Sequence, residues 1–397
     1  MKNVVETRDI LEKETTVNRP IKVLHMTMLG AGGISTLIVN INRCLDLNRV
    51  KFDYLVFRDR KEFYEDDVVA LNAEKKIADV ENIKNKLLLY YQKYKKTKSI
   101  LENGYYDVMH VDASTPLDVV IAAAAKKAGV KCVIFHSHNA GVDSKNIFKK
   151  FYNNICKAVM PYFVTDYFST SDVAAEFMFN KKVARSHSYK IIKNGIYADN
   201  YCYSEEKRKE FRNTIGVQDE FVIGHIGRFS TQKNHAFIIQ MFKELVAIEN
   251  KARLILVGDG PLRQEIEQQV VEYGLREKVI FYGLTKDVTS VLCGFDAFVF
   301  PSLWEGLGIV GIESQCSGLP TYCSRCVPYE ANVSDLFIKM NTDKPKDWAV
   351  KIIQDRVNYQ TGRQSRINEI IQAGFDIRTS AEMLQDYYIE SVNRTRN

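Results

Sequence analysis

The 397-residue sequence contains no run of about 18 uncharged apolar residues, the length needed to cross the hydrocarbon core of a membrane. Residues 1–19 are polar and charged, without the apolar stretch of a secretory signal peptide. No low-complexity segment and no repeat of short period is present. A membrane-spanning protein, a secreted precursor and a repeat protein are therefore disfavoured, and residues 1–19 are predicted to form a flexible leader.

Cysteine is present but is not arranged as in disulfide-rich or metal-binding proteins. The eight cysteines are scattered, and most stand in apolar surroundings, where cysteine behaves as a small buried hydrophobe. Cys323 and Cys326 form one Cys-x-x-Cys, without the second pair or the suitably spaced histidines that a zinc site requires. We expect reduced thiols, a cytoplasmic protein and no bound metal.

Charge of either sign is not in large excess, since 55 basic and 49 acidic side chains leave a net charge of +6. This small excess suits an anionic ligand or surface. It does not predict nucleic-acid binding, for which no known motif is present. Hydrophobic residues make up 46% of the chain, enough for a large core, and the length predicts two domains.

Strands and helices alternate along the chain, which predicts an α/β fold with parallel sheets. A strand at residues 21–28, the turn containing Gly32 and Gly33, and a helix at 34–45 form an arrangement that binds phosphate groups. The other predicted strands are 52–57, 107–111, 131–136, 221–226, 253–257, 279–282 and 297–300. The other predicted helices are 84–101, 118–128, 235–249, 262–273 and 381–392. The pattern restarts between residues 196 and 215, so we predict two doubly wound, Rossmann-like domains at 20–200 and 201–375, and a final segment at 376–397.

Four loops at the carboxyl ends of the second domain's strands carry the chemistry. Arg228 and Lys233, five residues apart on the first of these loops, can meet one anion, arginine through a planar fork and lysine as a point charge. The other loops contain the turn 258–261, the segment 283–284 and the segment 301–313. Open α/β sheets bind ligands at this edge, so we expect the four loops to form one site.

Glu305 and Glu313 make the segment after residue 300 the most informative part of the sequence. Seven residues separate the two carboxylates, and nearly all of them are small or apolar. Carboxylates in such surroundings need polar partners, and sugar or ribose hydroxyls are suitable. The helix that follows offers free N–H groups to anionic or polar ligand groups. The two glutamates are therefore predicted to hold two parts of one ligand, rather than to flank a scissile bond as in a hydrolase.

Arg228 with Lys233, the 258–261 turn and Glu305-x7-Glu313 together resemble the retaining family 4 glycosyltransferases of the GT-B fold, or "glycosyl transferases group 1". The sequences at 136–139 and 193–196 are similar to those of bacterial capsule and exopolysaccharide transferases. The resemblance covers nearly the whole chain. It implies two Rossmann-like domains that face each other across a cleft, and a C-terminal helix that crosses back to the first domain.

The resemblance implies a nucleotide-sugar donor, most often a UDP sugar. Arg228 and Lys233 would bind the diphosphate and stabilise charge on the leaving group, Glu305 would hold the sugar and Glu313 the ribose. The other donor-binding positions would be Gly32, Gly33, Gly258, Leu284, Gly306, Leu307, Gly308 and Ile309. Transfer would retain the anomeric configuration without a cofactor, a metal or a covalent enzyme intermediate.

One position departs from the family's pattern. Many members have His-x-His after the strand equivalent to 107–111, and the second histidine contacts the donor sugar. This chain has Asp112 at that place, following His110 and Val111. Either Asp112 makes the sugar contact or His138, after the next strand, does so; His138 is otherwise a structural residue at a strand end. His110 is expected to be buried and structural.

The acceptor is predicted to be a lipid-linked sugar or an oligosaccharide. Residues 145–163 are basic and aromatic, and with the lysines of 84–98 they would form a face that rests on anionic lipid at the inner side of the cell membrane. Solvated lysines over a packed helix face fit the same pattern equally well.

The leading prediction is a hexosyltransferase of cell-surface polysaccharide biosynthesis. One alternative is a nucleotide-sugar 2-epimerase of the same fold, which would release epimerised sugar without an acceptor. The other is a non-catalytic, transferase-like partner protein, which would be expected to have lost Arg228, Lys233 or Glu305, and all three are present.

Overall fold

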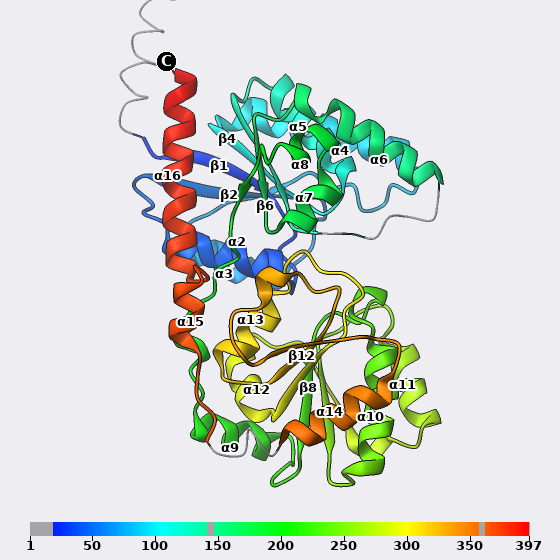
Figure 1. Ribbon diagram of the computed structural model, residues 1–397. Helices are drawn as coiled ribbons and strands as arrows, with labels where there is room; N and C mark the ends of the chain where they lie inside the picture. The colour runs from blue at the N-terminus through cyan, green and yellow to red at the C-terminus, as the bar shows by residue number, and fades with distance from the viewer. Residues whose placement is uncertain (1–18, 140, 142–146, 357–361, 397) are drawn as a thin grey trace, which may run out of the picture. The chain divides into compact units, whose positions relative to one another are not determined.

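The computed structural model describes residues 19–139, 141, 147–356 and 362–396, and these divide into two compact units (Figure 1). Unit 1 contains the described residues up to His138, those of 143–192 and those of 378–397, and unit 2 contains those of 139–142 and 193–377. The predicted leader lies outside the described residues except for Arg19, whose guanidinium pairs with Asp107 at 2.7 Å.

Unit 1 is built on a parallel sheet in which the described strands have the order β3-β2-β1-β4-β5-β6-β7. Its strands are β1 (Ile21–Met26), β2 (Val50–Val56), β3 (Lys75–Ile77), β4 (Val108–Ala113), β5 (Cys132–Ser137), β6 (Asp166–Ser169) and β7 (Lys190–Ile191). Its helices are α2 (Gly33–Cys44), α3 (Glu65–Ala70), α4 (Lys86–Gly104), η1 (Pro116–Asp118), α5 (Val119–Lys127), α6 (Ile147–Val159), η2 (Met160–Tyr162), α7 (Asp172–Met178) and α8 (Lys181–Arg185). β4 and β5 are buried along their whole length, as expected of central parallel strands.

The C-terminal helix α16 (Ile377–Arg396) belongs to unit 1 from residue 378 onward, which confirms the predicted return of the chain to the first domain. Tyr388 on this helix is fully buried, and the side chain of Gln385 accepts a hydrogen bond from the Asp46 backbone at 2.8 Å. The helix therefore contributes both apolar and polar contacts to unit 1.

Unit 2 is a second parallel sheet, whose described strands have the order β10-β9-β8-β11-β12-β13. They are β8 (Val222–Ile226), β9 (Arg253–Val257), β10 (Val279–Gly283), β11 (Ala297–Phe300), β12 (Thr321–Ser324) and β13 (Phe337–Met340). The helices are η3 (Ala198–Tyr201), α9 (Glu205–Thr214), η4 (Thr231–Lys233), α10 (His235–Ile248), α11 (Arg263–Glu272), η5 (Arg276–Lys278), α12 (Val288–Gly294), α13 (Ile309–Cys316), η6 (Tyr329–Ala331), α14 (Pro345–Arg356) and α15 (Ile367–Gln372). Alternate residues of β9 and β11 join two apolar clusters, one with α10, α11 and α14 and the other with α12 and α13, which lie on opposite sides of the sheet (Figure 1).

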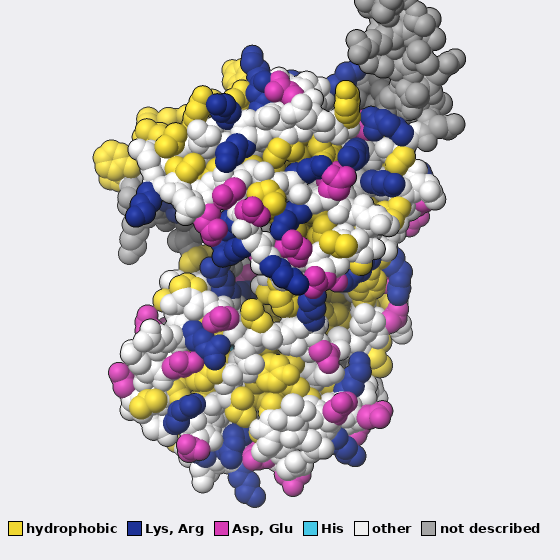
Figure 2. Space-filling view, turned by 180° about the vertical axis from the view of Figure 1, so that it is seen from behind, with side chains coloured by type: hydrophobic (Ala, Val, Ile, Leu, Met, Phe, Trp, Pro, Cys, Tyr) yellow, Lys and Arg dark blue, Asp and Glu magenta, His cyan; other side chains and the backbone are white. Residues whose placement is uncertain are grey.

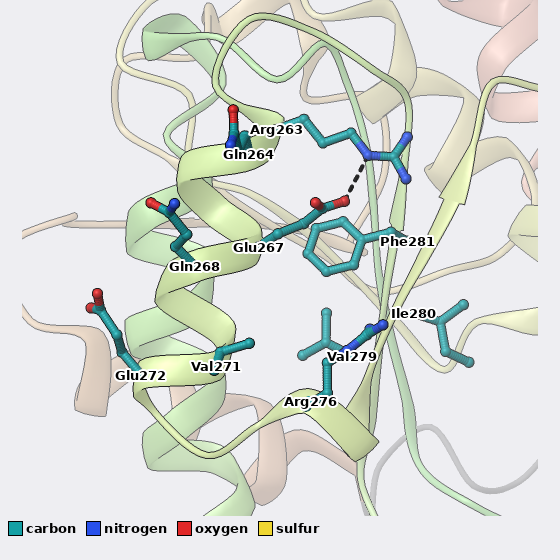
Figure 3. A pocket seen from close by; sticks show the side chains of 10 residues that line it. All are labelled: Arg263, Gln264, Glu267, Gln268, Val271, Glu272, Arg276, Val279, Ile280 and Phe281. Atoms are coloured by element: carbon teal, nitrogen blue, oxygen red, sulfur yellow. Dashed lines mark hydrogen bonds and ion pairs between the residues drawn. The ribbon is translucent and has the colours of Figure 1, made fainter.

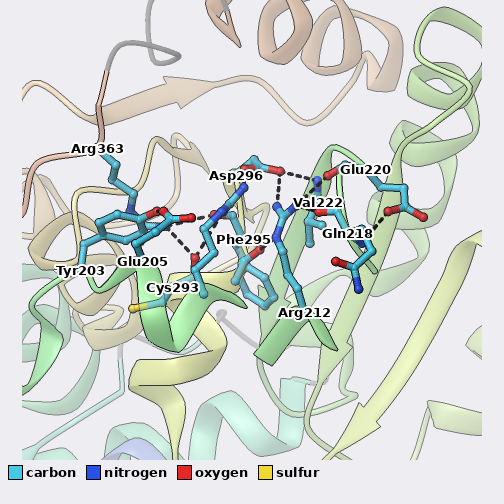
Figure 4. Close-up of polar contacts among 12 residues, drawn as sticks. Tyr203, Glu205, Arg212, Gln218, Glu220, Val222, Cys293, Phe295, Asp296 and Arg363 are labelled. Carbon is cyan, nitrogen blue, oxygen red and sulfur yellow. Dashed lines mark hydrogen bonds and ion pairs between the residues drawn. The ribbon is translucent and has the colours of Figure 1, made fainter. Parts of the chain in front are cut away.

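Asp296 fixes the amino ends of the two central strands of unit 2. Its carboxylate accepts hydrogen bonds from Arg208 and Arg212, both at 2.6 Å, and from the Val222 backbone at 2.7 Å (Figure 4). The guanidinium of Arg363 donates to backbone carbonyls at the end of α12, among them that of Phe295 at 3.0 Å. These ion pairs and hydrogen bonds hold the start of β8 and β11, while the opposite ends of the same strands carry the predicted site.

The boundary between the two units lies after residue 192, earlier than the predicted residue 200. The residues that follow it contact the last residues of unit 2. Lys193 donates to the carbonyl of Ala373 at 2.6 Å, and Ile196 forms a parallel bridge with Asp376. No helix among the described residues combines the length and the apolar character needed to span a membrane.

Candidate functional site

An ion pair joins the loops that follow β8 and β11, two neighbouring strands of unit 2. Nζ of Lys233 lies 2.6 Å from Oε1 of Glu305, and only 17% of the lysine side chain and 8% of the glutamate side chain are exposed. Two hydrogen bonds hold the same loops together: the Leu303 backbone donates to the Gln232 carbonyl at 2.8 Å, and the Gln232 side chain donates to the Trp304 carbonyl at 3.0 Å. The structure thus brings together two predicted residues that are far apart in the sequence.

Arg228 follows β8 in an exposed position, and its side chain has no hydrogen bond or ion pair within the part of the chain that the structure describes. The turn after β9 lies directly beside it. Gly258 has φ +132°, and a Cβ there would lie 2.2 Å from the carbonyl oxygen of Gly227. Only glycine allows the two loops to approach this closely. The result is a free guanidinium beside packed backbone, at the same edge of the sheet as Lys233.

Glu313 lies inside unit 2, in helix α13. Its carboxylate accepts a hydrogen bond from the hydroxyl of Tyr201 at 2.7 Å. Burial raises the pKa of Glu313 to about 7, although the Tyr201 hydrogen bond acts in the opposite direction. Further hydrogen-bond donors, such as ligand hydroxyls, would therefore stabilise the ionised form of Glu313. Tyr201 was not identified from the sequence, in which nothing links η3 to α13.

The segment between the two glutamates forms the start of α13. Gly308 is the N-cap with φ +87°, and a Cβ there would lie 2.8 Å from the ring of Phe300. Gly306 and Leu307 are buried and Ile309 is half-buried. The first N–H groups of an α-helix have no carbonyl partner inside the helix, so this turn can donate to a bound anion.

Leu284 follows β10 and is 54% exposed, so the backbone beside it is open to a ligand. In unit 1, Gly32 and Gly33 are exposed at the start of α2. Gly32 has extended backbone, and a Cβ there would meet no atom within 4 Å. The fold itself therefore does not require glycine at position 32. Another reason for a glycine here, proposed from the sequence, is the close approach of a ligand to the backbone.

Asp112 is buried at the end of β4 in unit 1, and both of its carboxylate oxygens are occupied. Oδ2 is 2.8 Å from Nδ1 of His25, and Oδ1 is 3.0 Å from Nε2 of His138. Burial raises the pKa of Asp112, but the surrounding histidines, His110 and His25 first, outweigh this effect and hold it well below its usual range. Of the two candidates for the sugar contact, Asp112 is thus engaged by histidines, whereas Nδ1 of His138 is buried without a partner in the described chain.

Two further histidines complete a cluster around Asp112. His110 is buried, as expected, and its Nε2 is 3.1 Å from Nδ1 of His136. Burial is the main reason why the pKa of each of these imidazoles lies well below the usual range, so both are neutral at pH 7. The register pairs His25 with His110 and Asp112 with His136. The sequence could not show this cluster, because it depends on β1 and β5 both lying beside β4.

A groove of about 850 Å³ lies along α11 and the edge strand β10 of unit 2 (Figure 3). Arg263 within it is paired with Glu267 at 2.9 Å, and its guanidinium lies over the ring of Phe281. None of the predicted site residues lines this groove. It is therefore separate from the edge that carries Arg228, Lys233 and Glu305.

Comparison with known proteins shows which proteins this chain is similar to. Residues 206–354 match the family described as "Glycosyl transferases group 1". The chain is 27% identical over 381 residues to the putative glycosyltransferase EpsF of Bacillus subtilis (strain 168), covering 95% of this chain and 98% of that protein. It is 25% identical over 305 residues to the Escherichia coli UDP-Gal:alpha-D-GlcNAc-diphosphoundecaprenol alpha-1,3-galactosyltransferase, covering 74% of this chain and 78% of that protein.

Among solved structures, Anabaena HepE in complex with UDP-glucose superposes with a TM-score of 0.76 at 19% identity, covering 93% of this chain and all of that one. This likeness concerns the fold. The comparisons confirm the predicted α/β fold of two Rossmann-like domains and the resemblance to group 1 glycosyltransferases.

Proposed function

We propose that this chain, a group 1 glycosyltransferase of the GT-B fold, transfers a hexose from a UDP sugar with retention of configuration to a lipid-linked or saccharide acceptor in cell-surface polysaccharide biosynthesis. The observation that carries the proposal is the pairing of Lys233 with Glu305 at the carboxyl edge of the unit 2 sheet, next to Arg228, which has no partner among the described residues. Two relatives support a transferase of this kind, since one is named as a glycosyltransferase and the other as acting on a diphosphoundecaprenol-linked sugar.

Lys233 and Arg228 supply two positive charges for a diphosphate. Both come from the loop after β8, and the N–H groups at the start of α13 face the same edge. Charge grows on the diphosphate as the sugar leaves, so fixed cations stabilise the transition state more than the ground state. On this proposal no metal is required. The leaving phosphate oxygen takes the acceptor proton.

Glu305 and Glu313 are assigned to two different parts of the donor. Glu305 is held by Lys233 at the loop, and we assign it to the sugar hydroxyls. Glu313 lies in α13, and we assign it to the ribose. In unit 1, we assign the sugar contact to His138 rather than to Asp112, because both oxygens of Asp112 already accept hydrogen bonds.

Thermal protection by ligands tests the donor assignment, because a ligand stabilises the folded state in proportion to RT ln(1 + [L]/Kd). UDP and a panel of nucleotide sugars are compared on the wild type and two variants. Glu305→Ala should keep the protection by UDP and lose the extra protection given by the sugar, whereas Lys233→Ala should lose both. Lys251→Ala, at the opposite end of the sheet, is the control. Equal loss of UDP and UDP-sugar binding in Glu305→Ala would contradict the assignment of Glu305.

Product analysis separates transfer from its alternatives. A retained anomeric configuration, read from the proton coupling of the product sugar, is expected when an acceptor is supplied. Free epimerised sugar in the absence of an acceptor would instead identify a 2-epimerase. Failure of every nucleotide sugar to protect the protein would favour the non-catalytic partner.

Helix α6 of unit 1 is the proposed contact with the membrane that carries the acceptor. None of its residues is buried. Phe148, Phe151, Tyr152 and Ile155 have the spacing of one helical face and are 75%, 60%, 53% and 43% exposed. Hydrophobic side chains gather over this end of unit 1, at the upper left of Figure 2. An exposed apolar stripe on a lysine-bearing helix favours an anionic lipid surface over the alternative of a packed helix face.

Sedimentation with vesicles tests this contact. The wild type should bind vesicles containing phosphatidylglycerol, and binding should weaken with salt. Phe148→Ser with Phe151→Ser should abolish binding without changing protection by UDP. Val271→Ser, which removes an exposed apolar side chain from unit 2, should bind like the wild type. Unchanged sedimentation of the wild type with and without acidic vesicles would refute the proposed contact.

A further inference from the structure

The carboxylate of Asp112 begins a chain of hydrogen bonds that ends on the C-terminal helix. Oδ2 of Asp112 faces Nδ1 of His25 at 2.8 Å, and Nε2 of His25 is 3.1 Å from the hydroxyl of Tyr388. The same hydroxyl is 2.7 Å from Nδ1 of His110, which continues to His136. All five side chains are buried. Tyr388 on α16 is thus connected to Asp112 at the end of β4.

The chemistry of the groups determines where their protons lie. An ionised carboxylate only accepts hydrogen bonds, so His25 donates to Asp112 through Nδ1 and His138 donates through Nε2. The proposed arrangement takes His25 and His138 as singly protonated imidazoles, so the other nitrogen of each ring carries a lone pair. Nε2 of His25 then accepts from the hydroxyl of Tyr388, and Nδ1 of His138 is left as an acceptor.

Because the hydroxyl of Tyr388 donates to His25, the directions of the remaining hydrogen bonds in the series are fixed. Its oxygen accepts from Nδ1 of His110, and Nε2 of His110 accepts from Nδ1 of His136. Every side-chain N–H and O–H in this series of hydrogen bonds then has an acceptor. The opposite direction would require a doubly protonated His25 and would end in an N–H at Nε2 of His136, which has no partner in the described chain. A buried N–H without an acceptor is less favourable than an unpaired lone pair.

We propose that Asp112 is a positioning residue that holds His138 with its proton on Nε2, so that the lone pair on Nδ1 accepts a hydrogen bond from a hydroxyl of the donor sugar. Tyr388 is a positioning residue that acts through His25, whose contact holds the Asp112 carboxylate in place. This inference rests on the proposed function. His138 lies one residue beyond β5, at the carboxyl edge where α/β sheets bind ligands. A lone pair accepts only from a donor group, so this position takes a hydroxyl and rejects a phosphate or carboxylate oxygen.

A metal ion is the competing occupant of this cluster, since two sets of residues, His25 with His110 and Asp112, and Asp112 with His136 and His138, each have ligand atoms within 4.8 Å of one another. Coordination through Nδ1 of His136 and Nε2 of His138 would move their protons to the outer nitrogens. Those nitrogens are buried and have no acceptor among the described residues, whereas metal-bound histidines ordinarily donate to one. The proton positions therefore disfavour a metal held by Asp112, His136 and His138. A metal held by His25, His110 and Asp112 would leave outer nitrogens that face the Tyr388 hydroxyl, so it is tested by the zinc content of the purified protein.

Nitrogen-15 NMR of the histidine side chains in the full chain tests the proton positions directly, because the two tautomers have different ring-nitrogen shifts. The sequence has only seven histidines, so each can be assigned by a single substitution. His138 should carry its proton on Nε2, and His25 on Nδ1. A proton on Nδ1 of His138, or stoichiometric zinc in the purified protein that perturbs these signals, would overturn the proposal.

Affinities for UDP and UDP-glucose test the positioning role. Asp112→Asn offers an N–H in place of one carboxylate oxygen, and one of the facing histidines must then change tautomer. Asp112→Asn and Tyr388→Phe should weaken UDP-glucose by about 3- to 10-fold, the range for one hydrogen bond, and leave UDP unchanged. Tyr387→Phe is the matched control, since the hydroxyl of this adjacent tyrosine bonds Asp166 and lies outside the cluster.

The outcomes are distinguishable. Wild-type affinity for both ligands in Tyr388→Phe and Asp112→Asn would overturn the positioning role. If the predicted tautomers were found in a protein that binds no nucleotide sugar, the proposed function would fail, and with it the sugar contact, although the arrangement of protons would stand.

Discussion

Replacing Glu313 by glutamine should stabilise the protein at alkaline pH and, if the proposed ribose contact is right, weaken the binding of UDP. Glu313 is buried in α13, with the hydroxyl of Tyr201 as its hydrogen-bond donor. Burial raises its pKa from 4.5 to about 7. Glutamine keeps the shape of the side chain and an oxygen for Tyr201, but it carries no charge at any pH.

The sign and size of the effect follow from the two pKa values. Between pH 4.5 and about 7 the folded protein keeps a proton that the unfolded chain has released. The contribution of Glu313 to the free energy of unfolding is therefore greatest below pH 4.5, and it falls as pH rises through this window. The loss between pH 5 and pH 8 is about 2.5 kcal/mol, because one pKa unit corresponds to about 1.36 kcal/mol and part of the change occurs below pH 5. Glu313→Gln lacks this loss.

Calorimetric Tm values at pH 5 and pH 8 measure the effect. The Tm difference between Glu313→Gln and the wild type should increase in favour of the variant by about 5 to 10 °C from pH 5 to pH 8, for a unit of this size. Any constant cost of the glutamine cancels in this comparison. Glu265→Gln, at an exposed position of α11, should show no such change. A Tm difference that is the same at both pH values would refute the reasoning.

Ligand binding gives the other half of the prediction. If Glu313 accepts hydrogen bonds from two ribose hydroxyls, the loss of its charge should weaken UDP by about 10-fold or more, since hydrogen bonds to charged groups contribute about 1.5 to 3 kcal/mol. Calorimetric titration with UDP at pH 8 measures it. Wild-type affinity in Glu313→Gln would remove this residue from the ribose site.

Two further predictions concern unit 2. Asp296→Ala should lower the free energy of unfolding by about 3 kcal/mol, because it leaves the buried Arg212 without its carboxylate partner. Urea denaturation measures this loss. A loss no larger than that of Asp219→Ala, on the neighbouring loop, would contradict the prediction. If the proposed diphosphate site is right, Gly258→Ala should weaken UDP by about 10-fold by displacing a loop of that site. Gly274→Ala, which also has positive φ but meets no atom within 4 Å, should cost only about 1 kcal/mol of stability and leave UDP binding intact. Equal effects of the two glycine substitutions on UDP binding would contradict the crowding at Gly258.

The sequence by itself determined to a large extent which loops of unit 2 lie together. The carboxyl ends of parallel strands meet at one edge, so strand periodicity was enough to place Arg228, Lys233 and Glu305 on neighbouring loops. The structure adds the 2.6 Å ion pair of Lys233 with Glu305, which no spacing in the sequence could give. Most of the predicted strands and helices agree with the observed bounds within a few residues, because their apolar periodicity is strong.

The shorter or less periodic elements, such as β3, β7 and α8, were not predicted. A strand of two or three residues has too few positions for a pattern to emerge, and it forms because a neighbouring strand offers hydrogen bonds.

Only the tertiary structure decided the surroundings of the buried carboxylates. Tyr201 meets Glu313 across 112 positions of sequence, and Tyr388 meets His25 across 363. Such contacts depend on the strand order and on where the C-terminal helix packs. A local sequence pattern predicts neither of these. The sequence could therefore show that Asp112 stands where a histidine is expected. The fold shows why both of its oxygens are occupied: the order β1-β4-β5 surrounds it with histidines.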